Sequence, residues 1–291
     1  MTGETAFIDR LRALATSPAA RGLNDDAAVL EIGGESIVLT HDMLVEGIHF
    51  LPDADLADVA WKLVATNISD LAAKGAEPIG VLLGHMLSAD DERFLEGLAE
   101  VLAYYRVPLL GGDTVSGSPP RAFGLTAIGR AVHSPVPSRA GARVGDALCL
   151  TGKVGAAMLG FEALRDGTGA DSIVYRRPMA RLRKGKLLAP LVTAMMDVSD
   201  GLLLDAARMA RASGVTLAID RAAVPIATPE DRRDDALRWG DDYALLFTVP
   251  PGIALPIRAH RIGVAEAASA TPILLDGKPL TETDGLGYQH Q

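Results

Sequence analysis

The sequence predicts a protein of two domains with an α/β (α+β) fold, because strand and helix patterns alternate on both sides of one break in composition. The chain has 291 residues, 48% of them hydrophobic, and can therefore bury a large core. Aromatic residues make up only 4% of it. This composition favours helices packed on sheets over a small, aromatic-rich β fold.

The N-terminal part shows helix and strand patterns in alternation. Phe7, Leu11 and Leu14 recur at helical spacing and predict a short amphipathic helix over residues 4–16. Residues 24–47 predict two strands joined by a Gly33-Gly34 turn, the second strand ending at residues 40–42. Further along we expect a helix over 55–75, a strand over 78–87, a helix over 88–106 that begins at Ser88, a strand over 107–117 that runs into a glycine turn, and a strand over 122–132.

A segment rich in Pro, Gly, Ser and Arg then interrupts the pattern at residues 134–146. We place the domain boundary there and expect an N-terminal domain over 1–136 and a C-terminal domain over 137–291. The first is expected to be a mixed sheet with helices, and the second an α/β domain. Within the second we expect a strand, a glycine turn and a helix over 147–167, a helix over 177–192, a strand end and a helix over 194–214, and strands over 215–225 and 241–250.

Charge and cysteine content exclude several classes of protein. The formal net charge is -9, which argues against a nucleic acid partner because phosphate backbones are also negative. Cys149 is the single cysteine, so an internal disulfide is impossible and a cysteine-built zinc site is not expected. The chain shows neither a signal-peptide pattern nor an apolar run near the ~20 residues of a membrane helix. We expect a cytoplasmic protein without a membrane partner.

Aspartates recur beside small or turn-forming residues where predicted elements end. Oxygen ligands of this kind suit Mg²⁺, a hard ion that binds few protein carboxylates alongside substrate phosphates. Any one of these turns alone is more often a structural turn, but their joint occurrence favours several ions around a triphosphate. The turns are Asn24-Asp25-Asp26, Thr40-His41-Asp42, Ser69-Asp70, Gly111-Gly112-Asp113 and Asp197-Val198-Ser199-Asp200-Gly201.

Two of these turns give the most specific signals. Gly111-Gly112-Asp113 allows the backbone to pass close to a ligand, since glycine has no side chain. Asp197 precedes an apolar helix that Ser199 or Asp200 is expected to cap. A P-loop is excluded because no GxxxxGK[ST] pattern occurs, and the signatures of protein kinases are missing as well.

Taken in order, the motifs resemble the thiamine-monophosphate kinase family, within the larger group that includes aminoimidazole ribonucleotide synthetase. The resemblance covers nearly the whole chain. The motifs that carry it are NDDAAVL, THDMLVEGIHF, NISDLAAKGAEP, GGDT, SRAGARVGD, MDVSDGL, GDDYALLF and the terminal GLGY.

The resemblance implies ATP-dependent phosphorylation of thiamine monophosphate to thiamine diphosphate by direct in-line transfer, in a homodimer whose N-terminal sheets meet near the ATP. It implies Mg²⁺ ligands at Asp26, Thr40, Asp42, Asp70, Asp113, Asp197 and Asp200, and we keep His41 as a further candidate ligand. ATP contacts are implied for Tyr105, Gly112, Asp113, Arg139 and Ser199, and substrate contacts for His49, Asp241 and Tyr288. No acid–base residue is assigned, because an attacking phosphate oxygen is already anionic.

Three departures from the family pattern bear on these expectations. Asn24 stands where glycine is usual, Asp241 where glutamate is usual, and Ala244 where another glutamate is common. Three alternatives stay open, the last of them because of Asp241 and Ala244. They are another ATP-using enzyme of the same superfamily, a phosphohydrolase with a metal site at His41-Asp42 and His49, and a nucleotide-binding relative without activity.

Overall fold

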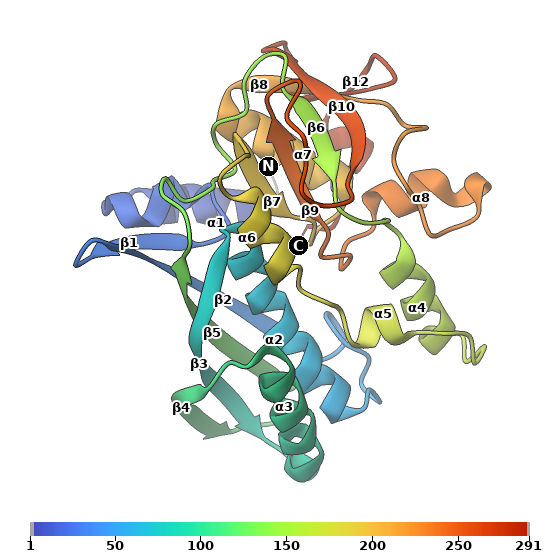
Figure 1. The fold of residues 1–291 in the computed structure, drawn as a ribbon. Helices are drawn as coiled ribbons and strands as arrows, with labels where there is room; N and C mark the ends of the chain where they lie inside the picture. Colours follow the sequence, from blue (N-terminus) through green and yellow to red (C-terminus); the bar gives the residue numbers. More distant parts are fainter. Residues whose placement is uncertain (1–2, 290–291) are drawn as a thin grey trace.

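The computed structural model describes residues 3–289, which form two β-sheets and the helices that cover them (Figure 1). The N-terminal helices are α1 (Gly3–Arg12), the 3-10 helix η1 (Pro18–Leu23), α2 (Leu56–Ala73) and α3 (Asp91–Tyr105). The strands of the first sheet are β1 (Ala28–Ile32), β2 (Glu35–Val45), β3 (Ala76–Leu87), β4 (Leu109–Ser116) and β5 (Ala122–Ala131).

The first sheet has the strand order β1-β2-β5-β3-β4. Neighbouring strands are antiparallel except for β3 and β4, which are parallel. Helix α2 packs on β2, β3 and β5, and α3 packs on α2. The buried side chains of this half form one core, in which Phe94 of α3 and Phe123 of β5 are fully covered.

The C-terminal part contains a seven-stranded sheet with the order β12-β11-β8-β10-β6-β9-β7. Its strands are β6 (Ala147–Leu150), β7 (Ala194–Asp197), β8 (Val215–Ile219), β9 (Leu245–Val249), β10 (His260–Ala267), β11 (Ile273–Leu275) and β12 (Lys278–Leu280). Its helices are α4 (Ala156–Arg165), α5 (Ile173–Arg176), α6 (Leu182–Leu188), α7 (Leu202–Ser213), α8 (Arg233–Arg238) and the 3-10 helices η2 (Glu230–Arg232) and η3 (Glu282–Asp284). The predicted fold class, with two domains of mixed α/β structure, is confirmed.

Helix α2 joins the two halves. Every residue of α2 is buried except Asp70, because one side packs on the first sheet and the other contacts α6 and β7 (Figure 1). The contact with α6 is close, since a Cβ on Gly185 would lie 1.9 Å from the carbonyl oxygen of Ala72. Near the other end of α2, the indole nitrogen of Trp61 donates to the carbonyl of Pro178 at 3.0 Å. The segment carrying α5 and α6 therefore returns over the N-terminal helix.

Several predicted boundaries were wrong. Strand β2 continues to Val45, so residues 40–42 lie inside it and not at its end. Gly111-Gly112-Asp113 lies inside β4, where Gly112 is required because a Cβ would fall 1.9 Å from the carbonyl oxygen of Leu83. Asp70 belongs to the last turn of α2. Helix α3 begins after Asp90, although Ser88 does bond to Asp91 nearby.

In the C-terminal half, the helix predicted over 177–192 is restricted to the seven residues of α6. Strands β10, β11 and β12 and the short helices α5 and α8 were not predicted. Cys149 is buried in β6, as expected for a small core side chain. Within residues 3–289, no helix has the length and apolar character needed to cross a membrane.

Candidate active site

A cavity of about 950 Å³ lies between the two halves and is lined by residues of both. Its walls include Asp42 of β2, Asp70 of α2 and Asp197 at the end of β7. Farther along, the walls include Asp241 in the loop before β9 and Tyr288 near the C-terminal end. The cavity thus brings together residues that are far apart in the sequence.

Three of the predicted carboxylates converge at one end of this cavity. Asp26, Asp70 and Asp197 each offer one oxygen, and these oxygens lie within 4.8 Å of one another. They come from a loop before a strand, from a helix and from the end of a strand. Asp42 joins this carboxylate cluster electrostatically, because the charges of Asp26 and Asp200 act on it. The structure therefore brings these aspartates close together, although they do not all stand on turns.

Burial and mutual repulsion make these carboxylates hard to ionise. Burial, reinforced by the charges of Asp200 and Asp26, raises the pKa of Asp42 to about 6. Burial and then the charge of Asp26 raise the pKa of Asp197 to about 8. Burial together with the three neighbouring carboxylates raises the pKa of Asp70 well above its usual value. A bound cation would remove this repulsion.

Neighbouring side chains fix the orientation of the cluster. Thr40 donates its hydroxyl hydrogen bond to Asp70, and Ser69 donates to Asp197 at 2.5 Å. Arg139, in the loop between the two sheets, lies 2.6 Å from Oδ1 of Asp26 through its Nε. The Nζ of Lys74 lies 2.7 Å from Oδ2 of the same residue. Arg139 was predicted at this site, whereas Lys74 was not.

The cluster suits a hard divalent cation. Its donors are all carboxylate oxygens, the ligands that Mg²⁺ and Ca²⁺ prefer. Oδ2 of Asp26 is buried without a hydrogen bond, its contact with Lys74 being an ion pair. Such an oxygen retains a lone pair for a metal.

The loop after β7 differs from its prediction. Neither Ser199 nor Asp200 caps α7, whose N-cap is Gly201 without a side-chain hydrogen bond. Instead, the backbone N–H groups of Ser199 and Asp200 both donate to Oδ2 of Asp205 at 3.0 Å. Asp205 lies inside an apolar helical stretch, and its carboxylate also pairs with Arg208. It therefore shapes the loop from within the helix, and both Ser199 and Asp200 line the cavity.

The three predicted substrate residues also line the cavity. His49 and Asp241 meet at Lys62, which marks the other end, whereas the backbone N–H of Tyr288 donates to the carbonyl of Asp200 at 2.9 Å. Asp241 has a positive φ of 62° and pairs through Oδ2 with Lys62 Nζ at 2.7 Å. Its Oδ1 accepts from the hydroxyl of Tyr243 at 2.9 Å. The same Lys62 donates to the carbonyl of His49 at 3.0 Å, so one buried ammonium connects two of the predicted residues.

An aromatic group at this end was missed by the sequence analysis. The Phe161 ring lies 5.2 Å from the Trp239 ring and 5.4 Å from the Tyr175 ring, measured between centroids. Lys62 Nζ lies 4.0 Å above the centroid of Tyr175. All three aromatic residues line the cavity. One feature of the sequence could have indicated this end of the cavity, namely a lysine inside the apolar run of α2. No feature of the sequence indicates that α4, α5 and the loop after α8 lie together.

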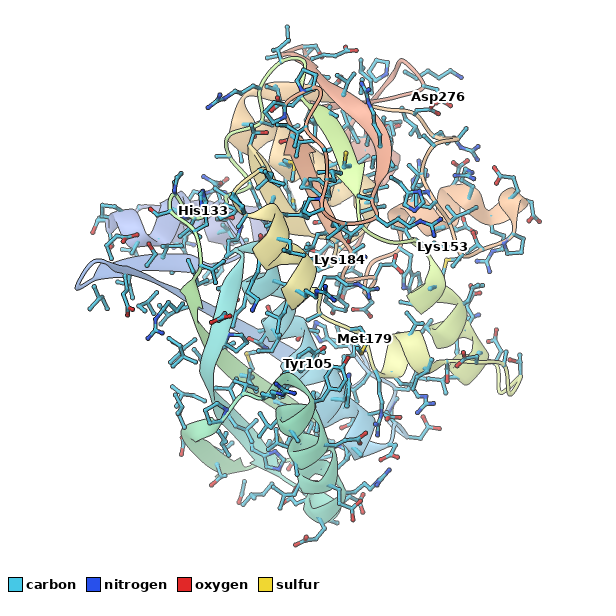
Figure 2. The ribbon with its side chains drawn as sticks, viewed as in Figure 1. Tyr105, His133, Lys153, Met179, Lys184 and Asp276 are labelled. Atoms are coloured by element: carbon cyan, nitrogen blue, oxygen red, sulfur yellow. The ribbon has the colours of Figure 1, made fainter. Side chains whose placement is uncertain are left out.

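Three predicted residues, Tyr105, Gly112 and Asp113, lie outside the cavity, and a fourth, His41, lies at its wall. Gly112 and Asp113 are exposed on β4, which β5 and β3 separate from β2. His41 is exposed on β2, and its Nδ1 lies 2.9 Å from the Thr126 hydroxyl. Tyr105 ends α3, where its hydroxyl accepts from the N–H of Ala180 at 2.9 Å (Figure 2). Their roles stay predictions.

Comparison with known proteins agrees with this architecture. Residues 24–131 match the AIR synthase related protein, N-terminal domain, and residues 143–260 match the AIR synthase related protein, C-terminal domain. A solved structure described as AaThiL complexed with AMPPCP and TMP superimposes with a TM-score of 0.86. It is 29% identical, and the match covers 96% of this chain and 94% of that chain.

Two curated relatives extend over both sheets. The thiamine-monophosphate kinase of Escherichia coli (strain K12) is 35% identical over 302 residues, covering 92% of this chain and 91% of that protein. The thiamine-monophosphate kinase of Caulobacter vibrioides is 38% identical over 277 residues, covering 88% of this chain and 77% of that protein. With identity at this level over most of its length, the chain belongs to the thiamine-monophosphate kinase family, within the AIR synthase related proteins.

Proposed function

We propose that this protein transfers the γ-phosphoryl group of ATP to thiamine monophosphate, giving thiamine diphosphate and ADP. The observation that carries the proposal is the single cavity with a carboxylate cluster at one end and an aromatic group at the other. The first end suits the metal-bound phosphates of a nucleotide, and the second suits a flat, cationic ring system. A relative solved with AMPPCP and TMP supports both ligands.

The proposed metal is Mg²⁺, held by the carboxylates of Asp26, Asp42, Asp70 and Asp197. When bound, it would neutralise phosphate charge and align the reacting groups. Thr40 and Ser69 keep two of these carboxylates in place through their hydroxyl groups. Asp200 at the cavity wall is proposed as a further ligand.

In the reaction, an anionic oxygen of the substrate phosphate attacks the γ-phosphorus of ATP, and the bond to the β-phosphate oxygen breaks as ADP leaves. The attacking oxygen needs no deprotonation, so the protein supplies alignment and charge rather than a general base. Arg139 and Ser199 are proposed to contact the nucleotide, together with Gly112 and Tyr105. The contact of Arg139 with Asp26, a proposed metal ligand, supports this role.

At the other end, the thiazolium of the substrate carries a positive charge beside an aromatic pyrimidine. The carboxylate of Asp241 and the rings of Phe161 and Trp239 offer complementary contacts. We further propose contacts from His49 and Tyr288. Asp241 is one methylene shorter than the glutamate usual in the family, and its ion pair with Lys62 supports a fixed carboxylate at this position.

We also propose a homodimer formed by the face of the first sheet that α2 does not cover. Leu82, Leu110 and Met43 are 39%, 52% and 51% exposed there, and Leu110 packs against Gly80. The proposed roles of Gly112 and Asp113 require this second copy, because β4 lies far from β2 in one chain. In light scattering, Leu82→Glu should halve the molar mass, while Leu164→Glu on α4 should leave it unchanged. A wild-type monomer would overturn the dimer.

The reaction itself is tested with purified protein, ATP and Mg²⁺. Thiamine monophosphate, thiamine and the aminoimidazole-pathway substrate are offered in parallel, and products are separated by chromatography. Formation of thiamine diphosphate from the monophosphate alone is expected. Binding of MgATP without turnover of any substrate would instead favour a nucleotide-binding relative without activity.

A further inference from the structure

Lys74 is a lysine whose charged group is buried inside the protein. It follows α2 as the C-cap residue and is 0% exposed. Its Nζ pairs with Asp25, lies 2.7 Å from Asp26 Oδ2 and lies 3.3 Å from the carbonyl oxygen of Met195. Lysine is rarely buried to this extent unless carboxylates compensate its charge.

The partner carboxylate Asp26 also belongs to the carboxylate cluster. Its two oxygens each face a fixed cation, Oδ1 the guanidinium of Arg139 and Oδ2 the ammonium of Lys74. Even so, Asp26 offers an oxygen within 4.8 Å of those of Asp70 and Asp197. The ammonium therefore acts on the same group that the proposed Mg²⁺ would use.

Charge balance shows what this ammonium contributes. The cluster contains four carboxylates, those of Asp26, Asp42, Asp70 and Asp197, and two fixed cations touch Asp26. With all six groups ionised, two negative charges remain, which one divalent ion would balance. Asp25, the other carboxylate at Lys74, is balanced by Arg21 and leaves this count unchanged. An uncharged side chain in place of Lys74 would leave three negative charges.

We propose that Lys74 is a built-in cation of the metal centre. Its ammonium neutralises part of the negative charge that divalent ions would otherwise have to neutralise. This inference rests on the proposed function, because it assumes that Mg²⁺ binds the cluster. The centre consequently remains folded without metal, and it binds divalent ions less tightly before the nucleotide arrives than the same carboxylates would alone.

The test compares Lys74→Met with the wild type in the absence of ATP and thiamine monophosphate. Mn²⁺ is titrated, and its free fraction is followed by electron paramagnetic resonance. Methionine keeps an unbranched side chain that is one atom shorter, and it removes the charge. We expect one more Mn²⁺ bound, or a Kd at least about tenfold lower, because a unit charge this close repels a divalent ion strongly.

Thermal unfolding with and without Mg²⁺ provides the second readout. Mg²⁺ should raise the Tm of Lys74→Met more than that of the wild type, since tighter binding stabilises the folded state more. Lys184→Met serves as the matched control. The Lys184 ammonium donates to the carbonyl of Thr151 at 2.9 Å, and both measurements should match the wild type (Figure 2).

A different result would overturn the inference. Suppose that Lys74→Met binds Mn²⁺ as tightly as the wild type does, and that its Tm is lower than the wild-type Tm by the same amount with and without Mg²⁺. Lys74 would then serve only to connect α2 to the carbonyl of Met195. If Lys74→Met does not fold, a second pair of variants replaces it: Asp25→Asn alone, and Asp25→Asn combined with Lys74→Met. In this pair the carboxylate of Asp25, which loses its lysine partner in Lys74→Met, is replaced by an uncharged amide. The double variant should bind Mn²⁺ at least about tenfold more tightly than Asp25→Asn, and equal affinities would reject the inference.

These measurements are independent of turnover. Failure of the kinase assay with the Mn²⁺ result intact would remove the proposed reaction and leave the built-in cation. The reverse outcome would leave the reaction and remove the role of Lys74.

Discussion

The two ends of the cavity differ in how far their negative charge is balanced. The carboxylate cluster has more negative charges than fixed cations, whereas the carboxylate at the other end, Asp241, has a lysine partner. Half-buried Asp70 lies beside the buried Asp197, and the pKa values of both are raised by loss of water contact and by neighbouring carboxylates. Asp241, by contrast, pairs with Lys62 and accepts from Tyr243. The first end is therefore prepared for cations that arrive with a substrate, and the second is already organised.

This comparison is most strongly tested by Asp70→Asn, which has the largest expected effect. We expect kcat to fall about a thousandfold or more, because a ligand of the phosphate-neutralising metal is lost. Stability without metal should not fall, since the amide removes a repelled charge from a buried position. Kinase assays and thermal unfolding of the metal-free protein check both parts. A variant that keeps its activity would show that the carboxylate cluster is not the phosphate end.

At the aromatic end, Asp241→Asn should raise the KM for thiamine monophosphate about tenfold, because one charge-assisted contact is lost. The KM for ATP should change little. Asparagine tolerates the positive φ of this position, so the backbone is preserved. Asp241→Glu is the matched variant that retains the charge. Equal effects on both KM values would mean that the two ends are not separate binding sites.

A smaller effect is expected from Phe161→Leu. The substitution keeps an apolar side chain but removes the ring contacts with Trp239 and Tyr175. Aromatic pairs contribute about 0.5–1.5 kcal/mol, so the KM for the substrate should rise roughly threefold to tenfold. Leu164→Ala on the same helix, at a partly exposed position, provides the comparison. Unchanged KM in Phe161→Leu would place the substrate away from these rings.

The smallest expected effect concerns stability. Burial raises the pKa of Asp242 to about 7, although Gly155 and Ala157 donate backbone hydrogen bonds to it. The folded form thus holds this proton more tightly than the unfolded form, and the free energy of unfolding falls as pH rises from about 4 to about 7. Asparagine has no carboxyl group to titrate, so Asp242→Asn does not lose this free energy of unfolding as the pH rises. Between pH 4 and 8, chemical denaturation should show the variant gaining about 1–3 kcal/mol relative to the wild type. An equal pH dependence would contradict the raised pKa.

The carboxylate end was largely predictable from the sequence, but for an incomplete physical reason. Aspartates in apolar surroundings did mark the site, because a buried carboxylate is costly unless it has a function or a partner. The assumption that they all stand on turns was wrong for Asp42 in β2 and Asp70 in α2. What they share is a position beside one cavity, which only the packing of α2 between the sheets creates.

The aromatic end could not be predicted in the same way. Phe161, Tyr175 and Trp239 lie in three segments whose local patterns are those of ordinary helices and loops. Their proximity depends on how α5 returns over α2, a long-range feature without a local sequence signal. The strands β10–β12 were missed for a related reason. Strands β11 and β12 have only three residues each, and β10 is mostly exposed or half-buried, so none of the three shows a clear apolar alternation.

The burial of α2 on both sides also limits how far the two halves of the protein can be separated or exchanged. A helix that is buried around nearly its whole circumference would expose apolar side chains to water if either half of the protein were produced alone. The halves match two family domains in sequence, yet they share one central helix, because Ala72 and Ala73 of α2 belong to a core cluster with Leu188 and Phe247 of the C-terminal half. A chimaera that exchanges either half with a relative should therefore transfer α2 together with the α6 surface facing it.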